Sequence, residues 1–259
     1  MTTVLVTGAA GRVGRFLRAS LPELGWQLRC TDVAAADGVQ AADVTSARAL
    51  DEVVPGADAI VHLAAQPVEA PWTVIREANL EGCYQVFEAA RRHGVRRVVY
   101  ASSNHAVGLT PNEPDLPAGT PPRPDTLYGV SKVFGEALGR YYAERYGIRV
   151  ACLRIGTCAE TPPNVRALAT WLSPGDCARL VDACLRSSDL DYAIVWGVSA
   201  NTRRTWSLAE ANRLGFVPQD DAEEFAGALA DATPKPSDDL VGGEFSSADY
   251  GIDEVTARW

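Results

Sequence analysis

A glycine-rich turn close to the start of the chain limits the fold more than any other feature of the sequence. It is preceded by the β-branched run TVLVT at 3–7, which predicts a buried parallel strand. The turn reads Gly8-Ala-Ala-Gly11-Arg-Val-Gly14, and apolar residues with helical spacing follow it. A strand, a glycine turn and a helix in this order are typical of the first unit of a doubly wound sheet, although an ordinary glycine-rich turn fits the same letters.

The spacing of this turn and the strand after it predict a dinucleotide site. Glycines let the backbone approach a pyrophosphate, which the positive end of the helix attracts. They follow GxxGxxG and not the commoner GxGxxG. The next strand pattern, 27–32, ends in Asp32, where a carboxylate would hold ribose hydroxyls and repel a 2′-phosphate. Arg12 could attract that phosphate, but we expect it to lie over the pyrophosphate, so NAD is favoured over NADP.

Strand and helix patterns alternate along most of the chain. Strands are predicted at 3–7, 27–32, 59–63, 97–102, 149–155 and 192–198, and helices at 12–22, 46–54, 73–93, 127–146, 176–187 and 219–230. The alternation predicts an α/β fold, a Rossmann-type doubly wound parallel sheet. We expect residues 1–155 to form the dinucleotide-binding core with the catalytic residues. Residues 156–259 should form a small C-terminal substrate-binding cap whose late strand and helix return to the core. The proline-rich stretch 111–124 predicts a surface loop.

The predicted helix 127–146 carries a tyrosine and a lysine four residues apart. Its apolar contacts are expected to be Phe134, Ala137, Leu138, Tyr141 and Tyr142. Tyr128 and Lys132 share one helix face, one turn apart, so the ammonium would favour the phenolate. Lowering a phenol pKa from near 10 to about 7 needs about 4 kcal/mol, which a lysine and a cationic nicotinamide could supply together. An exposed helix face without chemistry has the same pattern.

Charge and composition exclude several classes of partner. The net charge of −9 argues against nucleic acid, which needs a basic surface. No apolar run has the length of a membrane span, and Met1 leads directly into a strand with no signal peptide, so we expect a cytoplasmic protein without a membrane partner. The six cysteines form no CxxC pair and the three histidines are far apart, which predicts reduced core thiols and no metal site.

The motifs in their order resemble the extended short-chain dehydrogenase/reductase superfamily over roughly the first 155 residues. The resemblance rests on the glycine turn, on the two acids Asp32 and Asp43, on the segment 62–65 (HLAA), and on the Tyr128/Lys132 pair. It implies catalysis by Ser103, Tyr128 and Lys132. It also implies cofactor contacts from Gly8, Gly11, Arg12, Val13, Gly14, Asp32, Asp43, Val44, Leu63, Ala64, Ala65, Asn79, Tyr128, Lys132 and Ile155.

A narrower similarity runs nearly from end to end. The segments ASSNH (101–105), YGVSK (128–132), RIGTC (154–158) and VWGVSAN (195–201), with Arg166 before Thr170-Trp171, resemble the bacterial NAD-dependent uronate dehydrogenase family. This resemblance implies oxidation of C1 of cyclic D-galacturonate or D-glucuronate to an aldarolactone, with formation of NADH. The base would be Tyr128. A homo-oligomer is also expected.

The same resemblance implies a sugar site. Ser103, Asn104, His105 and Tyr128 would contact the sugar hydroxyls, and Thr157 and Arg166 would hold the substrate carboxylate. Thr157 stands where the family more often has serine, which keeps the hydroxyl. Pro67 stands where the family has a serine near the sugar, so the preference between the two uronates stays open.

Two other functions remain compatible with these motifs. An NAD-dependent nucleotide-sugar epimerase or dehydratase uses the same Ser–Tyr–Lys set, but carries a longer C-terminal domain than the roughly one hundred residues that follow Ile155 here. A non-catalytic dinucleotide-binding regulatory protein commonly lacks the tyrosine or the lysine, and both are present here.

Overall fold

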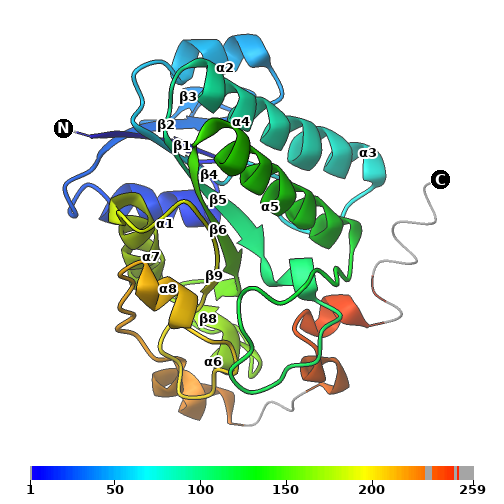
Figure 1. Ribbon diagram of the computed structural model, residues 1–259. Helices are drawn as coiled ribbons and strands as arrows, with labels where there is room; N and C mark the ends of the chain where they lie inside the picture. Colours follow the sequence, from blue (N-terminus) through cyan, green and yellow to red (C-terminus); the bar gives the residue numbers. More distant parts are fainter. Residues whose placement is uncertain (1, 231–234, 248–249, 251–259) are drawn as a thin grey trace.

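A seven-stranded parallel sheet forms the centre of the computed structural model, which describes residues 2–230, 235–247 and 250 (Figure 1). Its strands are β1 (Thr3–Thr7), β2 (Gln27–Asp32), β3 (Gln40–Ala41), β4 (Ala59–His62), β5 (Arg97–Ser103), β6 (Arg149–Ile155) and β9 (Tyr192–Gly197). Two further short strands, β7 (Thr157–Cys158) and β8 (Trp171–Leu172), pair with each other outside this sheet.

The strand order is that of a doubly wound sheet. It runs β3-β2-β1-β4-β5-β6-β9, with every neighbouring pair parallel. The chain moves outward from β1 to β3 and then crosses back to β4 on the other side of β1. The sequence prediction of a Rossmann-type sheet is confirmed. In such a sheet ligands bind where the strand order reverses, outside the carboxyl ends of β1 and β4.

Helices cover both faces of the sheet, which is why its central strands are mostly apolar and buried. One face carries α1 (Arg12–Ser20) and α7 (Pro174–Arg186), and the other carries α2 (Ala47–Val53), α4 (Gly82–Arg92) and α5 (Leu127–Tyr146) (Figure 1). Along β1, Val4 and Val6 belong to the core under the first pair of helices, and Leu5 belongs to the core under the second set. Side chains therefore alternate between two buried layers.

Two predicted helices differ in type from the expectation. The helix predicted at 73–93 is divided into α3 (Trp72–Ile75), the π-helical segment η1 (Arg76–Glu81) and α4. The helix predicted at 219–230 is a 3₁₀ helix, η3 (Ala222–Leu229). The shorter helices are η2 (Asn104–Val107), α6 (Ala167–Thr170), α8 (Ala209–Arg213), η4 (Pro236–Asp239) and η5 (Gly243–Ser246). π-helical turns are often found at functional sites, and η1 contains one of the predicted cofactor residues.

Helix α5 has the predicted bounds, and Leu138 and Tyr142 pack against the core as predicted, but other predicted contacts do not. Phe134 and Tyr141 are exposed, at 36% and 51% of their surface. The face against the sheet carries small and polar residues instead. A Cβ at Gly135 would overlap the Tyr100 side chain on β5, so glycine lets the helix approach the sheet closely. The prediction that Phe134, Ala137 and Tyr141 pack inward is wrong, because the helix faces the sheet through Gly135, Gly139 and Tyr142.

The C-terminal third completes the sheet and then returns to the site. Strand β9 pairs with β6, so the late strand joins the core sheet, whereas the late helix η3 packs on α6. The loop predicted at 111–124 is not wholly on the surface, since Leu116 and Ala118 are buried and Leu116 O accepts a hydrogen bond from Trp196 Nε1. Residues 231–234, 248–249 and 251–259, predicted to belong to the cap, lie outside the described residues.

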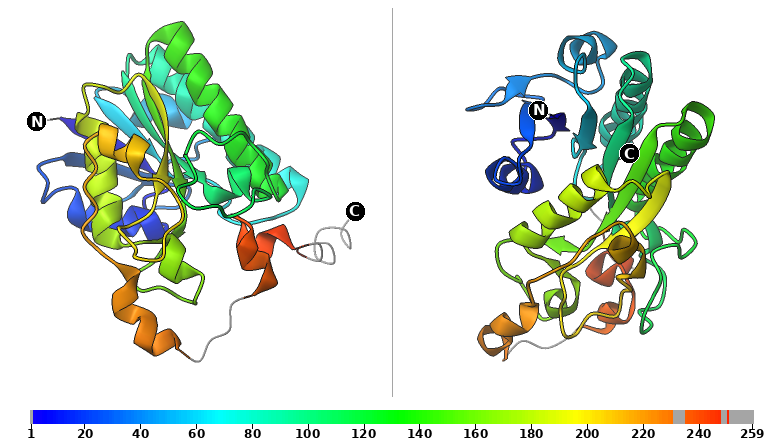
Figure 2. Two further views of the ribbon diagram at one scale, coloured as in Figure 1. Left: turned by 60° about the horizontal axis from the view of Figure 1, so that its bottom comes forward. Right: turned by 60° about the vertical axis from the view of Figure 1, so that its left-hand side comes forward.

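The last described segment reaches back to the carboxyl end of β5. The backbone N–H of Val241 donates to Thr110 O, and that of Gly242 donates to Gly108 O. Figure 2 shows this red-orange segment against the green loop that follows β5. Residues 241–246 are called the strap below. In the described part of the chain, no helix has the length and hydropathy required to cross a membrane.

Candidate active site

A cavity of about 830 Å³ opens at the carboxyl ends of the central strands, where the strand order reverses. Of the residues predicted for the site, the wall includes Gly8, Gly11, Arg12, Val13, Gly14, Asp32, Asp43, Val44, Leu63, Ala64, Ala65, Ser103, Asn104, His105, Tyr128, Lys132 and Ile155. The fold thus brings together residues up to 147 positions apart. Asn79, Thr157 and Arg166 do not line the cavity.

The glycine turn is shaped by close backbone contacts. Gly8 has a φ of 70°, and a Cβ there would lie 2.6 Å from the backbone nitrogen of Ala64 after β4. A Cβ at Gly14 would lie 2.5 Å from Gly8 O. Neither position has room for a side chain, so the turn is tight and α1 begins directly at the cavity. The first N–H groups of the helix can donate to an anion there. This cradle fits the pyrophosphate of a dinucleotide.

Asp32 is the last residue of β2 and lies next to the glycine turn. Its Oδ2 accepts a hydrogen bond from Ala10 N at 2.9 Å, and its Oδ1 accepts one from Val33 N at 2.8 Å. The carboxylate is therefore fixed against the glycine turn and still lines the cavity. This position fits a carboxylate that receives ribose hydroxyls.

Asn79 acts on the cavity wall only indirectly. It is buried in η1, its Oδ1 accepts from Gln66 N at 2.7 Å, and its Nδ2 lies within hydrogen-bond distance of Gln66 O (3.1 Å) and Ser131 Oγ (2.9 Å). Asn79 thereby ties the loop after β4 to helix α5. The side chain of Asn79 thus holds the Gln66 loop, and its predicted contact with the cofactor stays a prediction.

Tyr128 and Lys132 lie on one buried face of α5, as the spacing predicts. The Lys132 ammonium donates to Ala101 O at 2.8 Å and lies 5.3 Å from the centre of the Tyr128 ring. Burial raises the pKa of Tyr128 to about 12, although a hydrogen bond with Ser103 acts in the opposite direction. Burial also lowers the pKa of Lys132 to about 8. The protein's own groups therefore keep the phenol protonated, and Lys132 does not by itself produce the expected lowering.

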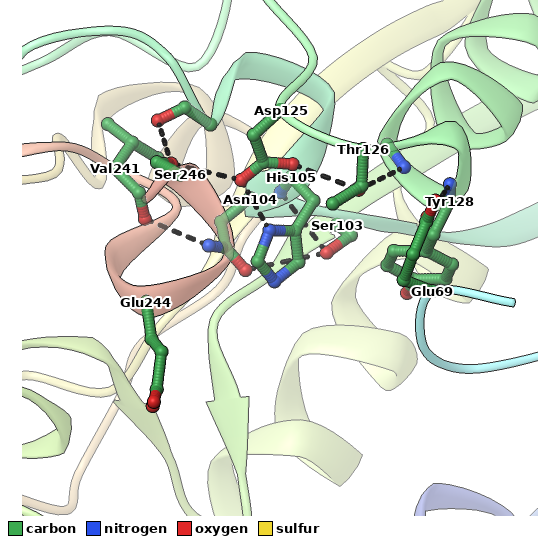
Figure 3. A network of polar contacts seen from close by, with 12 residues as sticks. Glu69, Ser103, Asn104, His105, Asp125, Thr126, Tyr128, Val241, Glu244 and Ser246 are labelled. Atoms are coloured by element: carbon green, nitrogen blue, oxygen red, sulfur yellow. Dashed lines mark hydrogen bonds and ion pairs between the residues drawn. The ribbon is translucent and has the colours of Figure 1, made fainter. Parts of the chain in front are cut away.

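The residues after β5 form a polar network with the loop before α5 and with the strap (Figure 3). Ser103 Oγ accepts from His105 N at 3.2 Å, and Asn104 Nδ2 donates to Val241 O at 2.9 Å. His105 Nδ1 lies 2.8 Å from Asp125 Oδ2. The sequence placed Ser103, Asn104 and His105 correctly at the carboxyl end of a strand, and the structure shows what fixes them.

Arg166, the N-cap residue of α6, is half-buried and not fully solvated. Its Nη2 donates to Val241 O, the same carbonyl that Asn104 uses, so the guanidinium lies next to the network of Figure 3. Its Nε is buried without a partner in the described part of the chain, and burial lowers the pKa of this side chain. Gly243 of the strap covers it, since a Cβ there would overlap Nε. Thr157 Oγ1 lies 3.0 Å from Thr170 Oγ1.

Sequence reasoning missed several residues of the site. The cavity wall also contains Gln66, Gly156, Cys158 and Phe245, and Asp125 lies just behind it. Asp125 directly precedes the Thr126 N-cap of α5, a helix-start signal that gives no hint of its contact with a histidine. In the described ranges no cluster of three or more His, Cys, Asp or Glu residues could hold a metal ion.

Comparisons with known proteins agree with this geometry. Residues 4–159 match the model of the NAD dependent epimerase/dehydratase family. Uronate dehydrogenase from Agrobacterium fabrum is 41% identical over 95% of this chain and 97% of its own length. NAD-dependent glucose-6-phosphate dehydrogenase from Haloferax volcanii is 40% identical over 86% of this chain and 95% of its own length.

A solved structure has the same fold. It is a variant of uronate dehydrogenase from Agrobacterium tumefaciens, complexed with NAD, and it matches with a TM-score of 0.89 at 40% identity over 95% of this chain and 97% of that one. The chain therefore belongs to the NAD dependent epimerase/dehydratase family, on the branch that it shares with the uronate dehydrogenases.

Proposed function

We propose that this chain catalyses the NAD-dependent oxidation of the C1 hydroxyl of a cyclic hexuronic acid, D-galacturonate or D-glucuronate, to an aldarolactone. The observation that carries the proposal is Arg166, whose Nε is buried without a partner among the described residues, beside the Ser103–Asn104–His105 cluster. A cation of this kind next to a polar sugar site favours an anionic sugar. The similarity to uronate dehydrogenases supports a carboxylate as that anion.

The cofactor end of the cavity uses the predicted residues. NAD would supply the hydride acceptor and, in its oxidised form, a positive charge. The N-terminal end of α1 and the glycine turn would hold its pyrophosphate, and Asp32 would hold the adenosine ribose. Asp43-Val44, Leu63–Ala65 and Ile155 line the space between and would contact the rest of the dinucleotide.

The proton of the C1 hydroxyl would go to Tyr128. Its phenol is buried next to Ser103, which would hold the same hydroxyl in line with the tyrosine oxygen. The Lys132 ammonium lies close enough to favour the phenolate as a nearby charge. Burial disfavours the charged form of Tyr128. Formation of the phenolate therefore depends on the Lys132 ammonium, which stays in the site, and on oxidised NAD, which enters it.

The substrate end would combine neutral and charged contacts. Asn104 and His105 would bind sugar hydroxyls, and Arg166 with Thr157 would hold the carboxylate. Val241 O now occupies donors of both Asn104 and Arg166, so a bound carboxylate would compete with the strap for the guanidinium. Thr157 and Arg166 are the part of this site that residues 156–259 would contribute, which supports that region as substrate-binding.

A sugar phosphate is the second candidate substrate, because a glucose-6-phosphate dehydrogenase is a relative at 40% identity. A 6-phosphate and a C6 carboxylate place an anion at the same end of the sugar. Nucleotide-sugar epimerases share only the fold at this level of identity, since UDP-galactose 4-epimerase is 20% identical with a TM-score of 0.67.

One spectrophotometric experiment separates these functions. The purified protein is mixed with NAD or NADP and with galacturonate, glucuronate, glucose 6-phosphate, galactose or glucose, and NADH or NADPH formation is followed. We expect NADH with the uronates and much slower reaction with the other sugars. NADH formation with glucose 6-phosphate alone would replace the uronate proposal by the sugar-phosphate one. NAD binding without turnover on any of these sugars would favour the epimerase or the regulatory protein.

We further propose a cytoplasmic homo-oligomer. The six cysteines are free thiols, five of them buried, which supports a reducing compartment, and light scattering of the purified protein would give the number of subunits.

A further inference from the structure

Asp125, in the loop before α5, lies at the centre of the polar network in Figure 3. Its side chain has no exposed surface. Oδ2 lies 2.8 Å from His105 Nδ1 and 3.1 Å from Ser246 Oγ, and Oδ1 accepts from Thr126 Oγ1 at 3.1 Å. Three possible donors therefore converge on one buried carboxylate, which can only accept hydrogen bonds while it is ionised.

The backbone around this carboxylate is built to enclose it. A Cβ at Gly108 or at Gly242 would overlap Asp125 Oδ2, so each position needs glycine. The two segments are joined directly, because Gly242 N donates to Gly108 O at 2.9 Å. The strap thus closes over the carboxylate and leaves the imidazole of His105 as the partner that faces the cavity.

The His105 ring is held on three sides. Phe245 of the strap stacks on it with the ring centres 4.3 Å apart, and Tyr128 meets it edge-on at 5.8 Å. Asp125 fixes the Nδ1 edge. Nε2, on the opposite edge, has no hydrogen-bond partner in the described residues, and His105 lines the cavity. The ring is therefore oriented with one free nitrogen.

We propose that Asp125 is a positioning residue that holds neutral His105 in the Nδ1–H tautomer, so that Nε2 offers a lone pair to a sugar hydroxyl. An ionised carboxylate requires the proton on Nδ1, which leaves Nε2 as an acceptor. The substrate hydroxyl at this position must then donate to His105. The other tautomer would set the Nδ1 lone pair against the Asp125 carboxylate at 2.8 Å and leave both acceptors without a donor. The hydroxyl contact rests on the proposed function, whereas the tautomer does not.

The tautomer is tested in the full-length protein labelled with nitrogen-15 in its histidines. The chain has only three, and His105→Gln identifies the signals of interest. At about pH 8.5, above the range in which histidine normally takes up its proton, we expect His105 as the Nδ1–H tautomer. Asp125→Asn should shift it toward Nε2–H, because an amide can donate to Nδ1. Ser246→Ala, which keeps the carboxylate, should leave the tautomer unchanged. An Nε2–H tautomer in the unmodified protein would overturn the proposal.

Kinetics give a second, separate test. Asp125→Asn, which has the same shape, should lower kcat/KM for the uronate by about tenfold or more, equal to about 1.4 kcal/mol. In a His105→Ala variant, Asp125→Asn should change kcat/KM little, since Asp125 acts through the imidazole. An equal loss in both backgrounds would indicate a merely structural role and would refute the proposal. Absence of uronate turnover in the unmodified enzyme would instead reject the proposed function, while the nitrogen-15 spectra would still decide the tautomer.

Discussion

The ammonium group of Lys132 lies 5.3 Å from the centre of the Tyr128 ring, but it donates its hydrogen bond to the backbone oxygen of Ala101. Lysine therefore acts on the tyrosine as a nearby charge and not as a hydrogen-bond partner. Since burial lowers the pKa of Lys132 to about 8 and raises that of Tyr128 to about 12, both charged forms are disfavoured in the protein alone. The proposed base thus depends on its electrostatic surroundings.

Replacing Tyr128 by phenylalanine should lower kcat by roughly 10²–10⁴, the usual effect of losing a general base. The ring stays in place, so the affinity for NAD should change much less. Stopped-flow kinetics and NAD titration measure the two effects. Lys132→Ala serves as the comparison, because it should lower kcat and also weaken NAD. Retention of more than about a third of the activity by Tyr128→Phe would move the base elsewhere, with His105 as the next candidate.

Asp32 should make the enzyme prefer NAD over NADP by at least about tenfold in kcat/KM, or about 1.4 kcal/mol. Its carboxylate is fixed by Ala10 N and Val33 N and would repel a 2′-phosphate. Asp32→Ala should narrow the preference, chiefly by weakening NAD, and Asp32→Asn tests the charge with little change of shape. Steady-state kinetics with NAD and with NADP measure the preference as the ratio of the two kcat/KM values. Equal use of NAD and NADP by the unmodified enzyme would show that Arg12 outweighs Asp32.

Arg166 should favour uronates over galactose or glucose by about 10³-fold in kcat/KM, or about 4 kcal/mol. Arg166→Ala should remove most of this preference, and Arg166→Lys should restore only part, because an ammonium lacks the two-pronged guanidinium geometry. The loss should appear largely in KM, since the contact exists before and during the reaction. Arg186→Ala, which changes an exposed arginine on α7, is the matched control. If Arg166→Ala still rejects neutral sugars with an unchanged KM for the uronate, the carboxylate binds to another residue.

His62 should make the protein less stable in acid. Burial lowers its pKa from 6.5 to about 3, so the unfolded chain binds more protons than the folded one between these two values. Stability is therefore lost as the pH falls through this window, by about 2 kcal/mol at pH 5. Urea unfolding at pH 7 and pH 5 measures the loss. In His62→Gln, which does not titrate, the loss between the two pH values should be smaller by about this amount. The same pH dependence in both proteins would mean that His62 is already charged in the folded state.

The sequence by itself determined the parts of this protein that depend on neighbours in the chain. Alternating strand and helix patterns predicted the parallel sheet, because periodicity is a local property. The glycines at 8, 11 and 14 predicted the turn between β1 and α1, and the spacing of Tyr128 and Lys132 placed them on one helix face. The position of Ser103 at the end of a predicted strand placed it at the site, since the carboxyl ends of parallel strands meet at one edge of the sheet.

Only the tertiary structure decided how the substrate end of the site is assembled. Asn104 meets Val241 across 137 residues, and Asp125 meets Ser246 across 121. No local pattern encodes such pairs, so neither the burial of Arg166 nor the contact of Asp125 with His105 could be read from the sequence. The inward face of α5 was misjudged for the same reason, because the space between helix and sheet is set by side chains of both. Local sequence fixes which element forms, whereas packing between distant elements fixes which side chains meet.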